Sequence, residues 1–562
     1  MKHIGPISGV ATHGGRWVAT AGYDNQVILW DARTRSPVAR GVHDHLANQC
    51  AFSADGSLLV SASSDYSARV WDGRTMRLKR VIDVHQDDVE MAEFSPDGRR
   101  VATCSRDCTV AVTDLDNGKS RVLRGHGADV ISVSWSADGS KVVSSSDDGT
   151  VREWDCATGA QTGLVDAGGV ETDTLIITED GLIVTGDDEG RISVVRDGQV
   201  SSFQVHGAGV KRLIYHRPTR QLASLSYDRR AALLRIGRGG ALEKIKETSI
   251  PSIVWPRSGA FVDRNHMAFG TFGSRYAVWD VEQDRWHTDA IEADHSVNAV
   301  AHLNGARYTI GDAGTLHRDG VAVRELGSLC NFLLPAGPVL LSGGQLGTVF
   351  DALSGRVVYQ HRSPLNCGAA FRKDGVLHAV IGAYTGEGIV LRVGDNGQCE
   401  HVTNLHLHGN AVKGLAADED YIFSVCADTS SRFTRIADWQ AHRDLPVSHN
   451  RIVNGCASFP GGFASVSRDL ALKLWFADGS LESYRSPHEN SIKCVAVCPE
   501  AQIVATGSYT GAISLFHLPS RSWVKTVRAS TWGISCITAV TGRPGTFAAS
   551  SYDGSVHEIA AD

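Results

Sequence analysis

The chain has 562 residues, which is more than one ordinary hydrophobic core supports, so two or more domains are expected. Charged residues make up 21% and hydrophobic residues 42% of the chain, with 59 glycines, and this balance excludes a disordered chain and a membrane-spanning one. The formal net charge of −7 argues against a protein that coats nucleic acid.

The start of the chain and its cysteines indicate a compartment. The opening residues, MKHIGPISGV, carry no basic-then-apolar leader, and no stretch approaches 18 consecutive apolar residues. Twelve cysteines are scattered along the chain, several of them inside predicted strands, which indicates reduced thiols rather than a disulfide framework. We therefore expect a cytoplasmic protein without bound cofactors.

The predicted elements are short strands that recur about every 40 residues. The first unit contains VATAGY, the turn DNQ and VILWD, an alternating pattern interrupted by turn residues. Residues 126–155 give the clearest copy: a histidine, an apolar strand, a Ser-x-Asp-Gly turn, a second strand, an Asp-Gly turn and a third strand ending in Trp-Asp. A strand repeat of this length predicts a circular or stacked architecture, with about fourteen copies.

Three positions can be followed from copy to copy: a histidine, an aspartate in the second turn and a tryptophan six residues after that aspartate. In chain order the complete sets are His3, Asp24 and Trp30; His43, Asp65 and Trp71; His126, Asp148 and Trp154; His449, Asp469 and Trp475. Other copies replace the tryptophan, with Thr113 after His85 and Asp107, Leu234 after His206 and Asp228, and Thr434 after His408 and Asp428.

This pattern resembles the WD-repeat β-propeller family, most closely in residues 1–155 and least in 165–200 and 291–400. The resemblance implies an all-β chain of four-stranded antiparallel blades in two seven-bladed propellers, residues 1–290 and 291–562. It also implies that histidine, aspartate and tryptophan form one hydrogen-bonded network in each complete blade. Blades without the tryptophan are then expected to rest on packing alone. The last repeat leaves no room for a further outer strand, so either the N-terminal segment completes a blade or one blade has three strands.

Aromatic and arginine side chains in connecting loops are the candidate partner contacts, because such residues are enriched among binding hot spots. Trp255 lies with Arg257 in an enlarged connection, Trp532 precedes the last repeat, and Trp439 lies in ADWQAHRDL. The alternative is that these tryptophans pack under their own loops or cap a central channel.

A basic stretch runs from Lys211 to Lys246 and contains ten lysines and arginines, among them Arg229, Arg230 and Arg235. Only Asp228 and Glu243 oppose them within the stretch. This asymmetry favours docking of a protein partner with an acidic surface. The alternatives are a solvated blade edge and nucleic-acid binding, the latter made unlikely by the acidic remainder of the chain.

No convincing catalytic or metal-binding motif is present. The tightest group of potential metal ligands is Cys399, His401, His406 and His408, but its two pairs fall on opposite faces of a straight strand, so surface histidines are the preferred interpretation. The sequence therefore predicts a non-catalytic protein-interaction scaffold within a larger assembly. The Ala-, Gly- and Arg-rich composition and the degenerate blades favour a bacterial origin, where proteins of the resembling family often accompany signalling or defence systems. The alternative is an enzyme or small-molecule binder that uses the channel of the C-terminal ring, with His302, Asp312, His317 and His378 as candidate residues.

Overall fold

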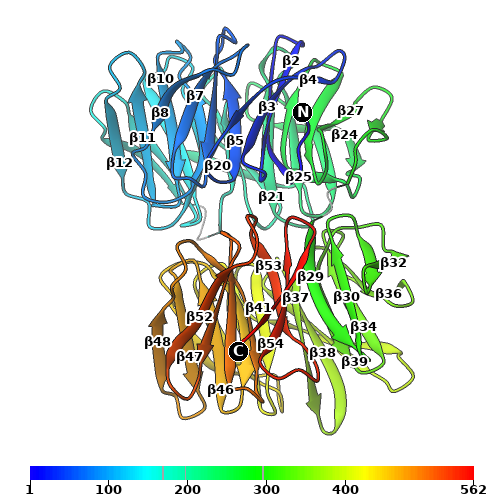
Figure 1. Cartoon of the computed structure of the whole chain (residues 1–562). Helices are drawn as coiled ribbons and strands as arrows, with labels where there is room; N and C mark the ends of the chain where they lie inside the picture. The colour runs from blue at the N-terminus through cyan, green and yellow to red at the C-terminus, as the bar shows by residue number, and fades with distance from the viewer. Residues whose placement is uncertain (167–169, 197, 294–295, 562) are drawn as a thin grey trace. The chain divides into compact units, whose positions relative to one another are not determined.

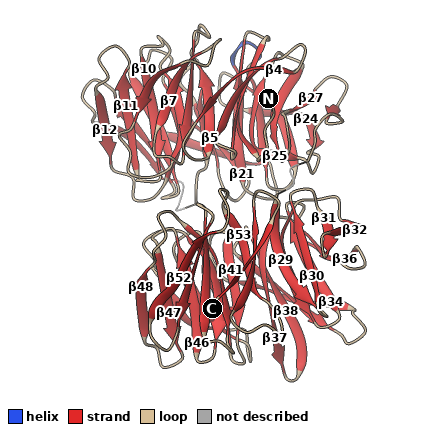
Figure 2. Ribbon diagram, in the orientation of Figure 1, coloured by secondary structure: helices blue, strands red, loops and turns tan. Residues whose placement is uncertain are grey.

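The computed structural model describes residues 1–166, 170–196, 198–293 and 296–561. Nearly every described element is a β-strand, as Figure 2 shows. The one described helix is the single 3-10 turn η1 (Arg217–Thr219), so no described helix is long enough to cross a membrane. The chain divides into two compact units, Met1–Asp294 and His295–Asp562, and each is described by itself below.

The described residues of the N-terminal unit form seven four-stranded antiparallel sheets, each in the order of the sequence. The first strands of successive sheets contact one another around a closed cycle, in which the seventh returns to the first. Figure 1 labels several of these blades. The first strands are β1 (Ile7–His13), β5 (Ala47–Phe52), β9 (Val89–Phe94), β13 (Val130–Trp135), β17 (Thr174–Ile177), β21 (Val210–His216) and β25 (Val254–Phe261).

Where the structure describes it, the C-terminal unit repeats this arrangement with six four-stranded sheets and a last sheet of three strands. Its first strands also close a cycle. They are β29 (Val297–Leu303), β33 (Cys330–Ala336), β37 (Leu365–Lys373), β41 (Val412–Ala417), β45 (Val453–Phe459), β49 (Ile492–Cys498) and β53 (Ile534–Ala539). The prediction of an all-β chain of four-stranded antiparallel blades is confirmed. Of the two alternatives left open for the last repeat, the structure shows the three-stranded blade, whose described residues form β53, β54 (Thr546–Ser551) and β55 (Val556–Ala560).

The hydrophobic core lies between the blades, because each sheet buries its apolar side chains against the sheets next to it in the ring. Trp30 illustrates this at the closure of the N-terminal ring: its ring packs edge-on against Tyr276 of the seventh blade, with centroids 5.7 Å apart. The N-terminal segment adds a backbone bond from His3 N–H to the Ser274 carbonyl, 3.0 Å. In the C-terminal unit, Ser296 Oγ donates to the Tyr552 carbonyl at 3.1 Å across the corresponding junction.

A β-bulge near the start of the first strand recurs in most blades. The ladder skips one residue, as between Ile7 and Gly9 in β1 and between Val412 and Gly414 in β41. A bulge leaves its extra residue outside the ladder and re-aims that side chain. In both units the first strands contact one another around the ring, so the bulged residues lie on its innermost strands.

Candidate binding sites at the ring centres

Most bulged residues of the C-terminal unit join one blade to the next. The side-chain amides of Asn298, Asn331, Asn366 and Asn454 each donate to a backbone carbonyl on the first strand of the following blade, at 2.7–3.1 Å. Ser535 donates in the same way to the Val297 carbonyl and so closes the ring. These contacts satisfy buried carbonyl groups and fix the spacing of the blades.

Two blades depart from this pattern and place lysines at the bulge. The β-ladder skips Lys413 in β41 and Lys493 in β49, as it skips the asparagines in their own strands. Both side chains are half-buried, and in the described chain no carboxylate lies within ion-pair distance of either ammonium group. The Lys413 ammonium instead lies 5.0 Å from the centre of the Tyr384 ring. The centre of this ring therefore carries two cations without acidic partners.

Burial, together with the positive charges of Lys493 and Arg468, lowers the pKa of Lys413 to about 8. The stacked rings of Tyr509 and Tyr552, 6.4 Å apart, belong to the same surroundings. At neutral pH the lysine is still mostly protonated, so a charge is held where water solvates it poorly. An anion placed here would relieve that cost and could accept hydrogen bonds from both ammonium groups.

The centre of the N-terminal ring has the opposite character. Glu90, the bulged residue of β9, accepts hydrogen bonds from Arg106 and, at 3.2 Å, from Arg257 of the seventh blade. Arg106 also donates to Asp129 at 2.8 Å. Since β9 and β25 are not neighbours in the ring, the Arg257–Glu90 pair crosses its centre. Arg106 and Arg257 are therefore matched by carboxylates at this centre, whereas the Arg212 guanidinium donates to Met91 Sδ at 3.6 Å.

Further carboxylates gather around Lys211, the bulged residue of β21. Its ammonium group pairs with Asp173 and with Asp188. Burial and the neighbouring negative charges raise the pKa of Asp147 well above its usual range. The N-terminal centre thus holds excess acidic groups, whereas the C-terminal centre holds excess cations.

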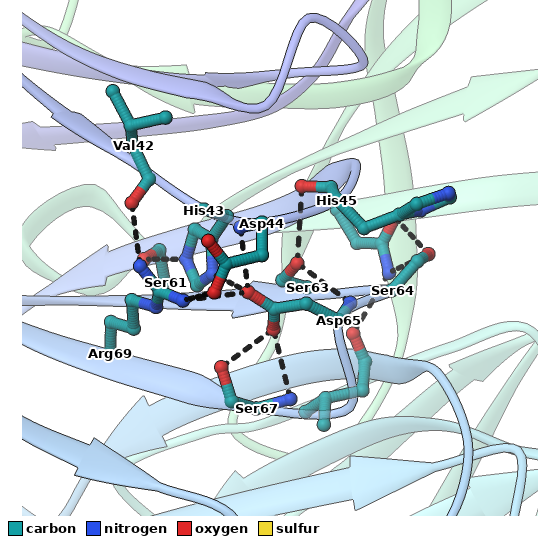
Figure 3. Close-up of polar contacts among 12 residues, drawn as sticks. Val42, His43, Asp44, His45, Ser61, Ser63, Ser64, Asp65, Ser67 and Arg69 are labelled. Carbon is teal, nitrogen blue, oxygen red and sulfur yellow. Dashed lines mark hydrogen bonds and ion pairs between the residues drawn. The ribbon is translucent and has the colours of Figure 1, made fainter. Parts of the chain in front are cut away.

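The blade networks lie on the outer side of these centres. In the second blade, His43 Nδ1 lies 2.9 Å from Asp65 and His43 Nε2 lies 2.7 Å from Ser61 Oγ (Figure 3). The same Ser61 oxygen accepts a hydrogen bond from Trp71 Nε1 at 2.8 Å. Burial would raise the pKa of Asp65, and the bond from His43 reverses that effect and lowers it. The other three complete sets have the same geometry, with Thr20, Ser144 and Ser465 as the bridging hydroxyl.

The sequence analysis missed this bridging hydroxyl. Its residue could have been found by spacing, because a serine or threonine stands ten residues before the tryptophan in every complete set. The expectation that blades without the tryptophan rest on packing alone is wrong. His85 contacts Asp107 at 3.0 Å and Thr103 at 2.8 Å. His206 likewise contacts Asp228, at 3.0 Å, and Ser224. Histidine and hydroxyl persist because they tie the loop to the second strand without help from the indole.

The proposed aromatic contact residues are largely built into the blades. Trp255 is 8% exposed and packs against Tyr23 and Phe272, so its assignment as an exposed loop anchor is wrong. Arg257 is held by Glu90 and Trp255. Trp439 packs on Phe371 and beneath Lys373, and Trp532 is half-buried. Of these residues only Trp532 and Trp439 keep part of the indole accessible.

The basic stretch does not form a continuous cationic surface. Arg229 is buried and donates to the Val254, Ile250 and Pro251 carbonyls, so its assignment as a docking residue is wrong. Arg230 pairs with Glu247, and Arg235 pairs with Glu243 at 3.2 Å. Several acidic partners come from outside the stretch and were therefore not counted in it, including Glu179 and Asp180 for Arg220.

The four potential metal ligands of residues 399–408 do not converge. His401 stacks on Tyr359 and hydrogen-bonds Asn404, His406 is exposed, and His408 is buried in its blade network. The channel candidates also lie apart. His302 and His317 stand on the first and third strands of one blade, and His378 stacks on Phe371 in another. Asp312 accepts a hydrogen bond from Asn298.

The bulged residues themselves were missed by sequence reasoning. A signal for them exists, because the bulged residue follows the blade histidine by five positions. This holds for Ser8, Asn48, Glu90, Lys211, Lys413, Asn454 and Lys493, which follow His3, His43, His85, His206, His408, His449 and His488. Without the ladder register, nothing in the sequence marks that position as the centre of the ring.

Comparison with known proteins identifies the repeats. A family model described as "WD domain, G-beta repeat" matches residues 2–31, 39–72, 76–114, 118–155 and 480–517. The chain is similar to a guanine nucleotide-binding protein subunit beta of Nicotiana tabacum, with 36% identity over 107 residues, which is 18% of this chain and 28% of the relative.

Two other relatives are similar over comparable lengths. Echinoderm microtubule-associated protein-like 2 of Mus musculus is 32% identical over 124 residues, 22% of this chain and 19% of the relative. WD repeat-containing protein 36 of Homo sapiens is 27% identical over 119 residues, 21% of this chain and 13% of the relative. The aligned part of this chain spans less than a third of the length of each of these relatives.

Proposed function

We propose that this chain, five segments of which match the WD-repeat family model, is a non-catalytic scaffold whose C-terminal ring binds an acidic segment of a protein partner. Its WD-repeat relatives point to a protein-interaction role. The observation that carries the finer proposal is the pair Lys413 and Lys493, which replace ring-joining side chains with cations that have no acidic partner in the described chain.

The binding chemistry is that of two partly desolvated cations with tyrosine rings beside them. Two ammonium groups supply charge-assisted hydrogen bonds to carboxylates, and Tyr384, Tyr509 and Tyr552 supply amphipathic surface. An aspartate or glutamate side chain on an extended loop fits this chemistry better than a folded acidic surface, because the cations are half-buried. The N-terminal centre, with its excess of carboxylates, would repel the same segment.

The test uses the full chain and a fluorescently labelled oligoglutamate peptide, with an oligoglutamine peptide of the same length as the uncharged probe. The double variant Lys413→Asn/Lys493→Asn installs the residue that four other blades carry at this position, so the ring should stay closed. We expect the wild type to bind oligoglutamate in preference to oligoglutamine and the double variant to lose that preference.

The matched control is Arg230→Gln, which removes an exposed cation of the basic stretch and should leave binding unchanged. Equal affinity of the wild type and the double variant for oligoglutamate would contradict the proposal. Binding of inorganic phosphate at the same lysines, without any binding of the peptide, would instead favour a small anionic ligand.

A further inference from the structure

The fourth blade of the C-terminal unit contains a chemical change that sets it apart from its neighbours. In six other blades a serine stands two residues before the turn aspartate, and its hydroxyl accepts the backbone N–H of that aspartate at 3.0–3.4 Å. These serines are Ser63, Ser105, Ser146, Ser226, Ser467 and Ser551. In the fourth blade the position holds Cys426, at the end of β42 (Tyr421–Cys426). An oxygen is thus replaced by a sulfur beside the blade histidine.

The turn aspartate of this blade is also arranged differently. In the complete networks the aspartate lies against histidine Nδ1, as Asp469 does against His449 at 3.0 Å. Here Ser430 Oγ takes that place, 2.8 Å from His408 Nδ1, and Ser430 in turn donates to Asp428. Asp428 is exposed, so its carboxylate has room to turn toward the histidine and the thiol once its hydrogen bonds from Ser430 are released.

One atom each of His408, Cys426 and Asp428 lie within 4.8 Å of one another. We propose that these three residues bind a zinc ion, with a water molecule as the fourth ligand. An imidazole nitrogen, a thiolate and a carboxylate oxygen are ligands that Zn²⁺ takes in tetrahedral sites, with bonds of about 2.0–2.3 Å. The ligand atoms must draw together by about 1 Å to reach such bonds, and Asp428 on its exposed turn is the residue able to move.

The surrounding hydrogen bonds suit this arrangement. With zinc on Nδ1 of His408, the Nε2–H group donates a hydrogen bond to Ser424 Oγ, which lies 2.8 Å away. The Ser424 hydroxyl in turn donates to the Arg432 carbonyl at 3.5 Å. A partner on the second nitrogen orients a histidine ligand and increases its basicity. Zinc binding displaces Ser430 from Nδ1, and the thiol proton of Cys426 passes to solvent. Blades that carry serine offer only weak oxygen donors at this place.

The experiment titrates the full, metal-free, reduced chain with Co²⁺ as a spectroscopic probe for zinc. We expect one equivalent to bind with near-ultraviolet thiolate-to-cobalt charge transfer, and Zn²⁺ to displace it. Cys426→Ser installs the serine that the six blades named above carry, and it should abolish the charge transfer while the fold is retained. Cys456→Ser, a thiol in the next blade, is the matched control and should leave the spectrum unchanged.

Two further readouts keep the test decisive. Asp428→Asn changes an exposed residue, so it should fold normally and still weaken cobalt binding if Asp428 is a ligand. Zinc should raise the Tm of the wild type and not that of Cys426→Ser. Charge transfer that persists in Cys426→Ser, or no charge transfer in the wild type, would overturn the proposal.

Discussion

Arg257 and Glu90, 167 residues apart in the sequence, are joined by a 3.2 Å hydrogen bond across the centre of the N-terminal ring. The bond links the first strand of the seventh blade to the first strand of the third, which do not touch as neighbours. Glu90 at the same time accepts a hydrogen bond from Arg106. One carboxylate therefore satisfies two guanidinium groups in a largely enclosed space.

From this geometry we expect Glu90→Gln to cost more stability than Arg257→Met. The first change leaves two buried cations short of their counter-charge, at a cost of about 3 kcal/mol, whereas the second leaves Glu90 still paired with Arg106 and should cost about 1 kcal/mol. Chemical unfolding of the full chain, followed by tryptophan fluorescence, measures both. Equal losses in the two variants would show that the cross-ring bond, rather than the carboxylate, is the dominant contribution.

The bridging hydroxyl of the blade network should matter most where a tryptophan is present. Ser61→Ala leaves His43 Nε2 and Trp71 Nε1 each without a partner and should cost about 2–4 kcal/mol, at about 1–2 kcal/mol for each unsatisfied group. Ser224→Ala removes one contact, to His206, and should cost about half as much. Melting temperatures of the two variants test this order, and a larger effect of Ser224→Ala would refute it.

Lys413 should lower stability while it supports binding. Its pKa in the folded chain is about 8, below the ordinary value of 10.5, so the folded state binds fewer protons than the unfolded state between these two values. The stability of the wild type should therefore rise as the pH increases from 8 to 10.5. Lys413→Asn should be more stable than the wild type at pH 7 by about 1–2 kcal/mol, and the difference should shrink over the same range.

The measurement is the free energy of unfolding of both proteins at pH 7, 8.5 and 10. A difference that stays constant with pH would show that the asparagine acts only by restoring a hydrogen bond to the next blade. A gain in stability combined with a loss of peptide binding would be the trade-off expected of a binding residue.

Glu93 in β9 gives a pH dependence of the opposite sign. Burial raises the pKa of Glu93 to about 7 from an ordinary value of 4.5, and one of its carboxyl oxygens has no hydrogen-bond partner. The folded state binds the extra proton, so the stability of the wild type should fall as the pH rises from 4.5 to 7. Glu93→Gln should remove this dependence and be more stable above pH 7 by about 1–3 kcal/mol.

Thermal unfolding of the wild type and Glu93→Gln at pH 5 and pH 8 distinguishes the outcomes. The two proteins should be close at pH 5 and diverge at pH 8. A wild type that is relatively more stable at pH 8 would mean that the carboxylate is ionised and satisfied in the folded chain.

The blade networks were predictable from sequence because their members stand at fixed offsets within one repeat. His126, Asp148 and Trp154 fall within 29 residues of chain, and alternation with period two together with turn residues fixes the strands that carry them. The prediction failed for exposure. The sequence places Trp255 in an enlarged connection, yet Tyr23 of the first blade, which is the neighbour of the seventh blade in the closed ring, packs against it.

The sequence by itself determined the repeat, the strands and the histidine-centred networks, since these depend on neighbours a few tens of residues apart. Only the tertiary structure decided what lies at the ring centres and which charges remain unmatched. Ring closure brings Arg257 to Glu90, and blade packing brings Glu179 to Arg220, so a count of charges along the chain could not find these pairs. In the C-terminal ring, packing leaves Lys413 and Lys493 without acidic partners in the described chain. Electrostatic energy depends on the distance between two charges in space, and a closed ring brings together charges that lie far apart in the sequence.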